Sequence, residues 1–132
     1  MPASHSPVPS APSGEVVIRT IAMPGVANAN GDIFGGWLVS QMDLGGAILA
    51  RHTALSRVTT VAIDGMSFIR PVGVGETVSC YAQIVSVGRT SMKISVEAWV
   101  HGFMDRSQHR VTSGLFTYVA LDPNGKPQPV KR

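Results

Sequence analysis

Residues 36–53, GWLVSQMDLGGAILARHT, decide the fold because their pattern differs from the rest of the chain. Apolar side chains recur there at i, i+3 and i+4 without the strict alternation of a strand, so the spacing predicts a helix. The segment is apolar on nearly all sides until Arg51 and His52, which predicts deep burial. Gly45 and Gly46 would each cost about 1 kcal/mol relative to alanine in a helix interior. We therefore expect another backbone, or a ligand, to approach the helix closely there.

The rest of the chain reads as strands and turns. Residues 16–23 are β-branched and short, and Pro24-Gly25 ends that strand. After Arg57 the pattern is that of a sheet, with strands expected at 58–69, 77–87, 91–101 and 109–121 and a candidate bulge at Gly65. One long helix with antiparallel strands predicts an α+β domain in which the helix packs on one face of the sheet.

Residues 91–101 alternate most clearly among the expected strands. The face predicted to be buried carries Met92, Ile94, Val96, Ala98 and Val100. Glu97 and Trp99 fall on the other face, where we expect Glu97 to be exposed or ion-paired. An apolar helix and a sheet face that carries a tryptophan together indicate self-association.

The composition excludes several classes of protein. A chain of 132 residues fits one domain, and 44% hydrophobic with 14% charged residues excludes a disordered polyelectrolyte. The uncharged stretch 44–50 is far shorter than the ~18 apolar residues that span a bilayer. The net charge of +3 comes from Lys126, Lys131 and Arg132. Since no basic stripe with interleaved aromatic residues occurs, nucleic-acid binding is not expected.

The termini and the single cysteine bear on the cellular location of the protein. Residues 1–14 are rich in proline and serine and lack the apolar core of a secretion signal, so they predict a disordered arm before a domain over 15–127. Residues 128–132 are expected to be a flexible tail. Cys80 has no partner for a disulfide, and its alternation with Val78 and Ala82 predicts a buried thiol. A cytoplasmic protein is expected.

Asp43 is the residue that does not fit its surroundings. It lies within the apolar helix, with no base within one turn to pair with it. One interpretation is a carboxylate on a narrow solvent-facing stripe beside Ser40 and Arg51. The other is a site carboxylate in an apolar cleft, poised as a base or a nucleophile.

The loop before the helix supplies groups that would complement such a carboxylate. Gly35 and Gly36 lie at the expected helix start, where unpaired backbone N–H groups and the helix dipole stabilise an anion or oxyanion. Asn28 and Asn30 add side-chain amides that would orient a water or a carbonyl, although asparagine in a loop is more often a turn former. The four histidines show no metal-ligand spacing, and no metal or cofactor is expected.

Four segments carry a resemblance to a known family: NANGDIFGGWLVSQMD (28–43), FIRPVGVGE (68–76), GRTSMKISVEAWV (88–100) and FTYVALDPNGKP (116–127). Together they resemble the hot-dog-fold acyl-CoA thioesterases, and the YciA-type bacterial enzymes in particular. The resemblance implies a long central helix wrapped by a five-stranded antiparallel sheet. It also implies that two subunits pair their sheets and that dimers associate as trimers of dimers, which form a hexamer.

The same resemblance implies roles for individual residues. Asp43 matches the helix carboxylate that acts on the thioester, and Asn28 matches a loop asparagine that meets the carboxylate of the neighbouring subunit. Gly35 and Gly36 match the glycines whose amides polarise the thioester carbonyl. The turn of Gly88, Arg89, Thr90 and Ser91 matches a segment that contacts coenzyme A.

Helix geometry explains why the resemblance requires two subunits. Gly36 and Asp43 are seven residues apart, which is ~10 Å of axial rise and too far for both to touch one carbonyl carbon. Coenzyme A carries several phosphate charges, so Arg70, Arg89 and Lys93 are candidates for charge-assisted contacts, unless they are ordinary solvated bases.

These observations lead to a prediction of function. We expect an enzyme that hydrolyses acyl-CoA to a free acid and coenzyme A without a metal. The absence of a G-x-S-x-G segment argues against a serine-triad esterase. The alternative from another class is a non-catalytic acyl-CoA sensor on the same fold. A hydratase is a weaker alternative, because no histidine-containing hydratase motif is visible.

Overall fold

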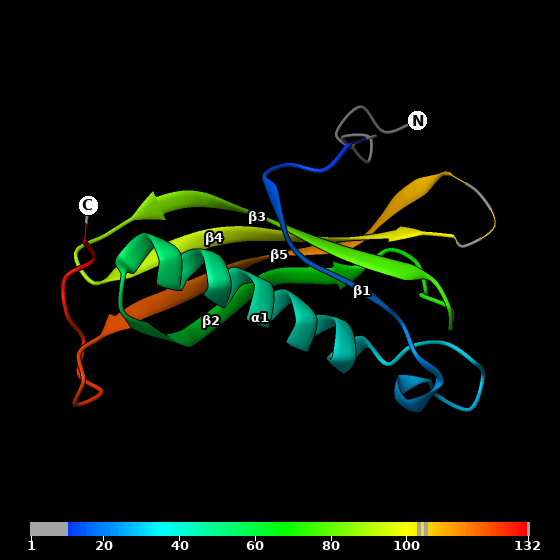
Figure 1. Ribbon diagram of the computed structural model, residues 1–132, viewed down its shortest axis with the longest axis horizontal. Helices are drawn as coiled ribbons and strands as arrows, with labels where there is room; N and C mark the ends of the chain where they lie inside the picture. The colour runs from blue at the N-terminus through cyan, green and yellow to red at the C-terminus, as the bar shows by residue number, and fades with distance from the viewer. Residues whose placement is uncertain (1–10, 103, 105, 132) are drawn as a thin grey trace.

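The computed structural model describes residues 11–102, 104 and 106–131. One long helix lies across one face of a five-stranded antiparallel sheet with the strand order β1-β3-β4-β5-β2 (Figure 1). The elements are β1 (Glu15–Ile21), a short 3-10 helix (Pro24–Val26), α1 (Gly35–Ala54), β2 (Arg57–Phe68), β3 (Thr77–Val87), β4 (Ser91–His101) and β5 (Gln108–Leu121). The predicted α+β class and the helix-on-sheet arrangement are confirmed. Most of the predicted arm lies outside the described residues.

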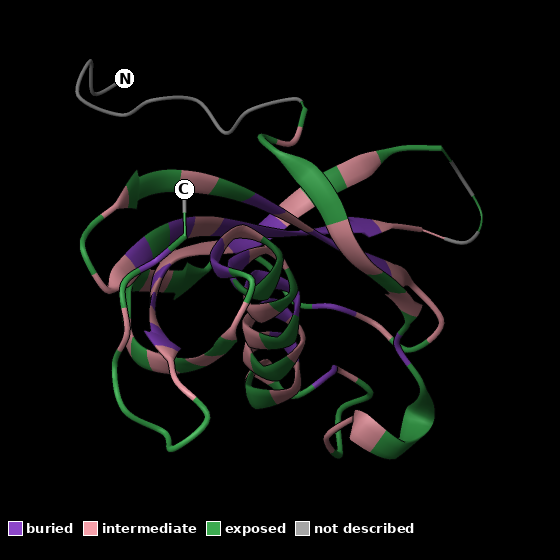
Figure 2. Ribbon diagram, turned by 60° about the vertical axis from the view of Figure 1, so that its left-hand side comes forward, coloured by how far each residue is buried: buried purple, intermediate pink, exposed green. Residues whose placement is uncertain are grey.

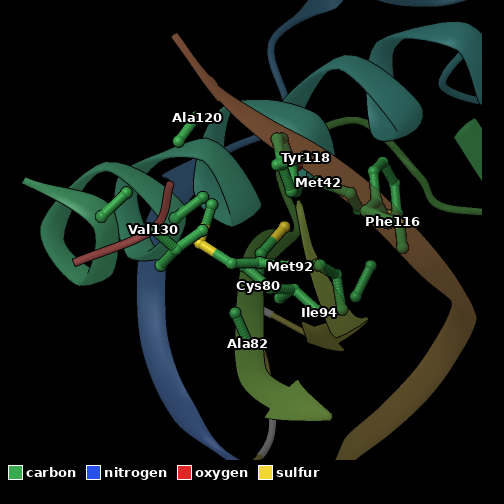
Figure 3. Packing of buried hydrophobic residues seen from close by; sticks show 13 residues of the cluster. Met42, Cys80, Ala82, Met92, Ile94, Phe116, Tyr118, Ala120 and Val130 are labelled. Carbon is green, nitrogen blue, oxygen red and sulfur yellow. The ribbon is translucent and has the colours of Figure 1, made fainter. Parts of the chain in front are cut away.

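Helix α1 and the sheet enclose the main core. The strands curve around the helix, and the buried residues gather where the two face each other (Figure 2). Sulfur-containing and aromatic side chains fill the space between them, among them Met42, Cys80, Met92, Phe116 and Tyr118 (Figure 3).

Within the described residues, no helix combines the length and the apolar character that crossing a membrane requires.

The two glycines in the middle of α1 are explained by close packing, as expected, but the approaching groups are side chains. A Cβ atom at Gly45 would lie 2.7 Å from Cγ2 of Val17 on β1. A Cβ atom at Gly46 would overlap the hydroxyl of Tyr118 on β5. The expectation of a backbone or a ligand at this place is therefore wrong. The two glycines lower the helix propensity of α1, but because they lack side chains the helix and the sheet can pack tightly together.

Strand β4 follows its predicted alternation on one face only. All five side chains expected to be inside are buried, but Glu97 and Trp99 on the opposite face are buried as well. The indole Nε1 of Trp99 donates to Oε1 of Glu97 at 2.8 Å, and the backbone N–H of Ser13 donates to the same oxygen at 3.2 Å. Arg110 lies 3.9 Å from Oε2. Glu97 is thus ion-paired, one of its two expected states.

The C-terminal segment corrects the prediction of a flexible tail over 128–132. Gln128 N–H donates to the carbonyl of Ala120 at 2.9 Å, and Val130 N–H donates to the carbonyl of Arg89 at 2.8 Å. The Val130 side chain is buried against the main core. Residues 128–130 thus pack against the domain, since an apolar side chain and two backbone donors find partners in β5 and the β3–β4 turn.

Candidate active site

Asp43 points from α1 to the sheet, where two hydroxyl groups bind it. Its Oδ1 accepts a hydrogen bond of 2.6 Å from Oγ1 of Thr60 on β2 and one of 3.1 Å from the hydroxyl of Tyr118 on β5. Thr60 and Tyr118 are paired directly across the β2–β5 ladder. The cross-strand pair therefore places two donors side by side beneath one carboxylate. This geometry favours the site carboxylate over a solvated stripe.

The hydroxyl of Tyr118 is neutral and donates. Tyr118 is fully buried, and burial, followed by the neighbouring charge of Asp43, raises its pKa far above the ordinary value. The same hydroxyl also lies 2.9 Å from the backbone carbonyl of Asp43, so it contacts one backbone oxygen and one side-chain oxygen of that residue. Tyr118 thereby ties the position of the carboxylate to the backbone of α1.

Cys80 is buried as predicted and has no place in the chemistry. Burial raises the pKa of its thiol to about 12. Because the thiolate is the nucleophilic form, a thiol of this kind is unreactive at neutral pH. Among the described residues, the carboxylate of Asp43 is the stronger candidate for attack on an electrophile.

The start of α1 presents backbone amides without a side-chain cap. Phe34 precedes the helix and makes no capping hydrogen bond through its side chain, and the first turn contains no acidic residue. A Cβ atom at Gly36 would have no neighbour within 4 Å, whereas one at Gly35 would lie 3.2 Å from the ring of Phe68. Amides at a helix start attract negative charge, and the missing side chain at Gly36 leaves them accessible.

A pocket of about 410 Å³ lies beside this helix start. Gly35 and Arg70 both line it, so the structure brings these two predicted site residues together. The remaining lining is mainly apolar and comprises Ile33, Leu38, Phe68, Ile69, Pro71 and Val72. An apolar pocket with a few polar groups at its wall is typical of small-molecule sites.

Asn28 is fixed by the turn that leads into the helix. Its Oδ1 accepts hydrogen bonds from the N–H groups of Asn30 at 2.9 Å and Asp32 at 3.1 Å. Its own N–H donates to the carbonyl of Asp32 at 2.7 Å. The side-chain oxygen is therefore used by the fold, which leaves the NH₂ group as the part of Asn28 that can donate to another molecule. Asn30 contributes its backbone N–H to this turn.

One chain alone does not bring the predicted catalytic residues together. The contacts found for Asp43 come from Thr60 and Tyr118, and those of Asn28 come from its own loop. Gly36 precedes Asp43 by about two helical turns, or ~10 Å along the axis. Within the described residues, the carboxylate and the amide donors thus form two separate half-sites.

The predicted coenzyme A segment lies at the opposite end of α1 from the pocket. The carbonyls of Arg89 and Thr90 accept hydrogen bonds from Val130 and Ala120, and Gly88 N–H donates to the carbonyl of Ser91 at 2.8 Å. The side chains of Arg89 and Lys93 are exposed. Since α1 has 20 residues and is about 30 Å long, this turn and Arg70 do not meet in one chain.

A family model described as the thioesterase superfamily matches residues 30–102, from the loop before α1 to the region after β4. The chain belongs to the thioesterase superfamily. The acyl-CoA thioester hydrolase YciA of Salmonella typhimurium is 55% identical to this thioesterase over 122 residues, which cover 90% of this chain and 92% of the relative.

Two solved structures are similar to this thioesterase over most of their length. A hexameric thioesterase from Yersinia pestis is 52% identical, with a TM-score of 0.88, and the match covers 93% of this chain and 100% of that chain. A hexameric hot-dog-fold thioesterase from Campylobacter jejuni is 41% identical, with a TM-score of 0.83 over 89% of this chain and 91% of that one. The predicted family and the predicted hot-dog fold are confirmed.

Thr60 and Tyr118 are two residues of the candidate site that the sequence pattern did not predict. Both lie in expected strands, and a tyrosine in the apolar alternation between Phe116 and Ala120 was the available signal. A buried hydroxyl needs a partner. Asp43, the only acid within the apolar helix, was a candidate partner for the Tyr118 hydroxyl. The strand register that pairs Thr60 with Tyr118, however, cannot be read from either strand alone.

Proposed function

We propose that this protein hydrolyses acyl-CoA thioesters to a carboxylic acid and coenzyme A, with Asp43 as the general base or the nucleophile. The observation that carries the proposal is a half-buried helix carboxylate that two neutral hydroxyls of the sheet bind in a thioesterase-family fold. The similarity to the acyl-CoA thioester hydrolase of Salmonella typhimurium supports the substrate class.

Two routes fit this carboxylate. As a general base, Asp43 accepts a proton from water while the water oxygen attacks the carbonyl carbon. As a nucleophile, it forms a mixed anhydride and expels the thiolate, and water then hydrolyses the anhydride. In both routes the carbonyl oxygen gains negative charge, which the amides of Gly35 and Gly36 would stabilise, and the C–S bond breaks to release coenzyme A.

The two half-sites are proposed to meet across a dimer. Strand β2 is an edge of the sheet and exposes Val61, Ile63 and Phe68, which supports its pairing with a second copy. Asp43 is bonded to Thr60 on this same strand, so its carboxylate lies next to the proposed interface. Across it, the partner subunit's Asn28 and helix amides would supply the donors that one chain cannot.

The hexamer is proposed to consist of three such dimers. The similar thioesterases from Yersinia pestis and Campylobacter jejuni are hexameric. Leu44 and Ile48 are exposed on α1 and provide an apolar surface for further contacts. Assembly would also bring Arg70 near a neighbour's turn with Gly88, Arg89, Thr90, Ser91 and the nearby Lys93, where these groups would bind the phosphates of coenzyme A. A cytoplasmic location stays a prediction.

The proposal is tested by the release of free thiol from a panel of acyl-CoAs. We expect the parent protein to release one coenzyme A for each acid formed. Asp43→Asn removes the base while keeping the shape of the side chain, so we expect kcat to fall about 10²- to 10⁴-fold with substrate binding retained. Glu15→Gln, at an exposed carboxylate on β1 at the opposite edge of the sheet, is the control and should retain the parent rate.

Three results would contradict this proposal in different ways. Unchanged turnover by Asp43→Asn would remove Asp43 from the mechanism. Tight binding of acyl-CoA without any thiol release by the parent protein would identify a sensor instead. Addition of water to an enoyl-CoA, with the thioester left intact, would identify a hydratase.

A further inference from the structure

We infer that Tyr118 is a positioning residue of this reaction, whose buried hydroxyl acts with Thr60 to hold one oxygen of Asp43 and leave the other to react. The inference rests on the proposed function, since it concerns the carboxylate proposed to act on the thioester. It goes beyond that function by assigning a task to a residue of β5 and separate tasks to the two oxygens of one side chain.

Packing and hydrogen bonds together fix the position of the Tyr118 side chain. Its ring is fully buried and stacks with that of Phe116, with ring centroids 6.3 Å apart and 12° between the planes. The ring lies beside Met42 beneath the helix (Figure 3). Its hydroxyl occupies the space that a side chain at Gly46 would otherwise fill. The hydroxyl is therefore held in place by packing as well as by its hydrogen bonds.

Both acceptors of the Tyr118 hydroxyl belong to Asp43. The hydroxyl oxygen lies 2.9 Å from the backbone carbonyl oxygen and 3.1 Å from Oδ1. The carbonyl belongs to the rigid helix, whereas the carboxylate can rotate about the side-chain torsions. A donor that contacts both keeps the carboxylate in one orientation relative to α1.

The two hydroxyls converge on one carboxylate oxygen. Thr60 donates to Oδ1 at 2.6 Å, and Tyr118 contacts the same atom. Among the described residues, Oδ2 makes no hydrogen bond, so its lone pairs are not used by the two donors. Charge on Oδ1 is stabilised, and Oδ2 is the atom that accepts the proton of water or bonds to the carbonyl carbon. The Tyr118 proton stays on its oxygen throughout.

The test is Tyr118→Phe, with kcat and KM measured for an acyl-CoA that the parent hydrolyses. Phenylalanine keeps the ring and its stacking and removes only the hydroxyl. We expect kcat to fall about 10- to 100-fold with KM little changed, because a hydrogen bond to a charged group is lost.

Two further variants separate positioning from a general structural effect. Tyr81→Phe removes a hydroxyl that accepts from Arg19 at 3.1 Å on the other side of the sheet, so it should keep the parent kcat and KM. Thr60→Val removes the second donor to Oδ1 and should lower kcat with KM little changed, as Tyr118→Phe does. Thr60→Ser keeps a hydroxyl and should keep most of the parent rate. If Tyr118→Phe does not fold, the Thr60 pair still decides whether donors to Oδ1 set kcat.

The outcomes are distinguishable. A parent that hydrolyses acyl-CoA, with Tyr118→Phe sharing its kcat, would overturn this inference and leave the proposed function intact. A rise in KM alone would also overturn it, because it would make Tyr118 a binding residue. A parent that hydrolyses no acyl-CoA would instead remove the proposed function on which the inference rests.

Discussion

At the scale of the residue, the chemistry depends on what Asp43 contacts. Its hydrogen-bond partners are the neutral hydroxyls of Thr60 and Tyr118. A cationic partner would hold the carboxylate more strongly but would make it a poorer base. Neutral donors fix its orientation at a smaller loss of reactivity, which suits a carboxylate that must take a proton or attack a carbonyl.

Arg89 provides a test of coenzyme A binding at the same scale. Its exposed side chain is proposed to bind a phosphate, a contact that is the same in the ground state and the transition state. We expect Arg89→Ala to raise KM about 10-fold, the loss of one charge-assisted hydrogen bond, while kcat changes little. Steady-state kinetics with Lys126→Ala as the control would check this, and a loss confined to kcat would instead place the turn near the chemistry.

At the scale of the element, the fit between α1 and the sheet depends on Gly46. A methyl group there would overlap the Tyr118 hydroxyl. We expect Gly46→Ala to lower the free energy of unfolding by about 1–2 kcal/mol, since overpacking outweighs the gain of about 1 kcal/mol in helix propensity. Thermal and denaturant unfolding would measure the change.

Gly25→Ala is the matched control for this prediction, because a Cβ atom at Gly25 would have no neighbour within 4 Å. The cost of Gly46→Ala should also shrink in a Tyr118→Phe background, where the overlapping oxygen is absent. Stabilisation by Gly46→Ala in the parent would show that the helix does not fit the sheet as described.

Local pattern was sufficient to predict the elements but not their contacts. Helix periodicity and strand alternation predicted α1 and β2 to β5, because burial on one face repeats with the geometry of each element. Asp43 was predicted as a site residue because it is the acid within an apolar helix. Thr60, Tyr118 and the buried Val130 were not predicted, since their partners are set by long-range register and packing that no local pattern encodes.

At the scale of the whole molecule, a single chain has only part of the proposed site. The carboxylate lies beside the edge strand β2, the helix amides lie about two turns away along α1, and Asn28 is hydrogen-bonded within the loop that precedes α1. The exposed apolar residues of β2 and α1 support an assembly in which a second copy completes each site. The fold thus explains why an exposed edge and an incomplete site occur together.

Complementation between two inactive variants tests this claim most directly. Asn28→Ala and Asp43→Asn, each expected to have little activity alone, would be refolded together in equal amounts and assayed for thiol release. If every site combines residues of two subunits, half of the dimers are mixed and each has one intact site of two, so we predict about a quarter of the parent activity. A mixture no more active than the separate variants would show that both residues act within one chain and would contradict the account.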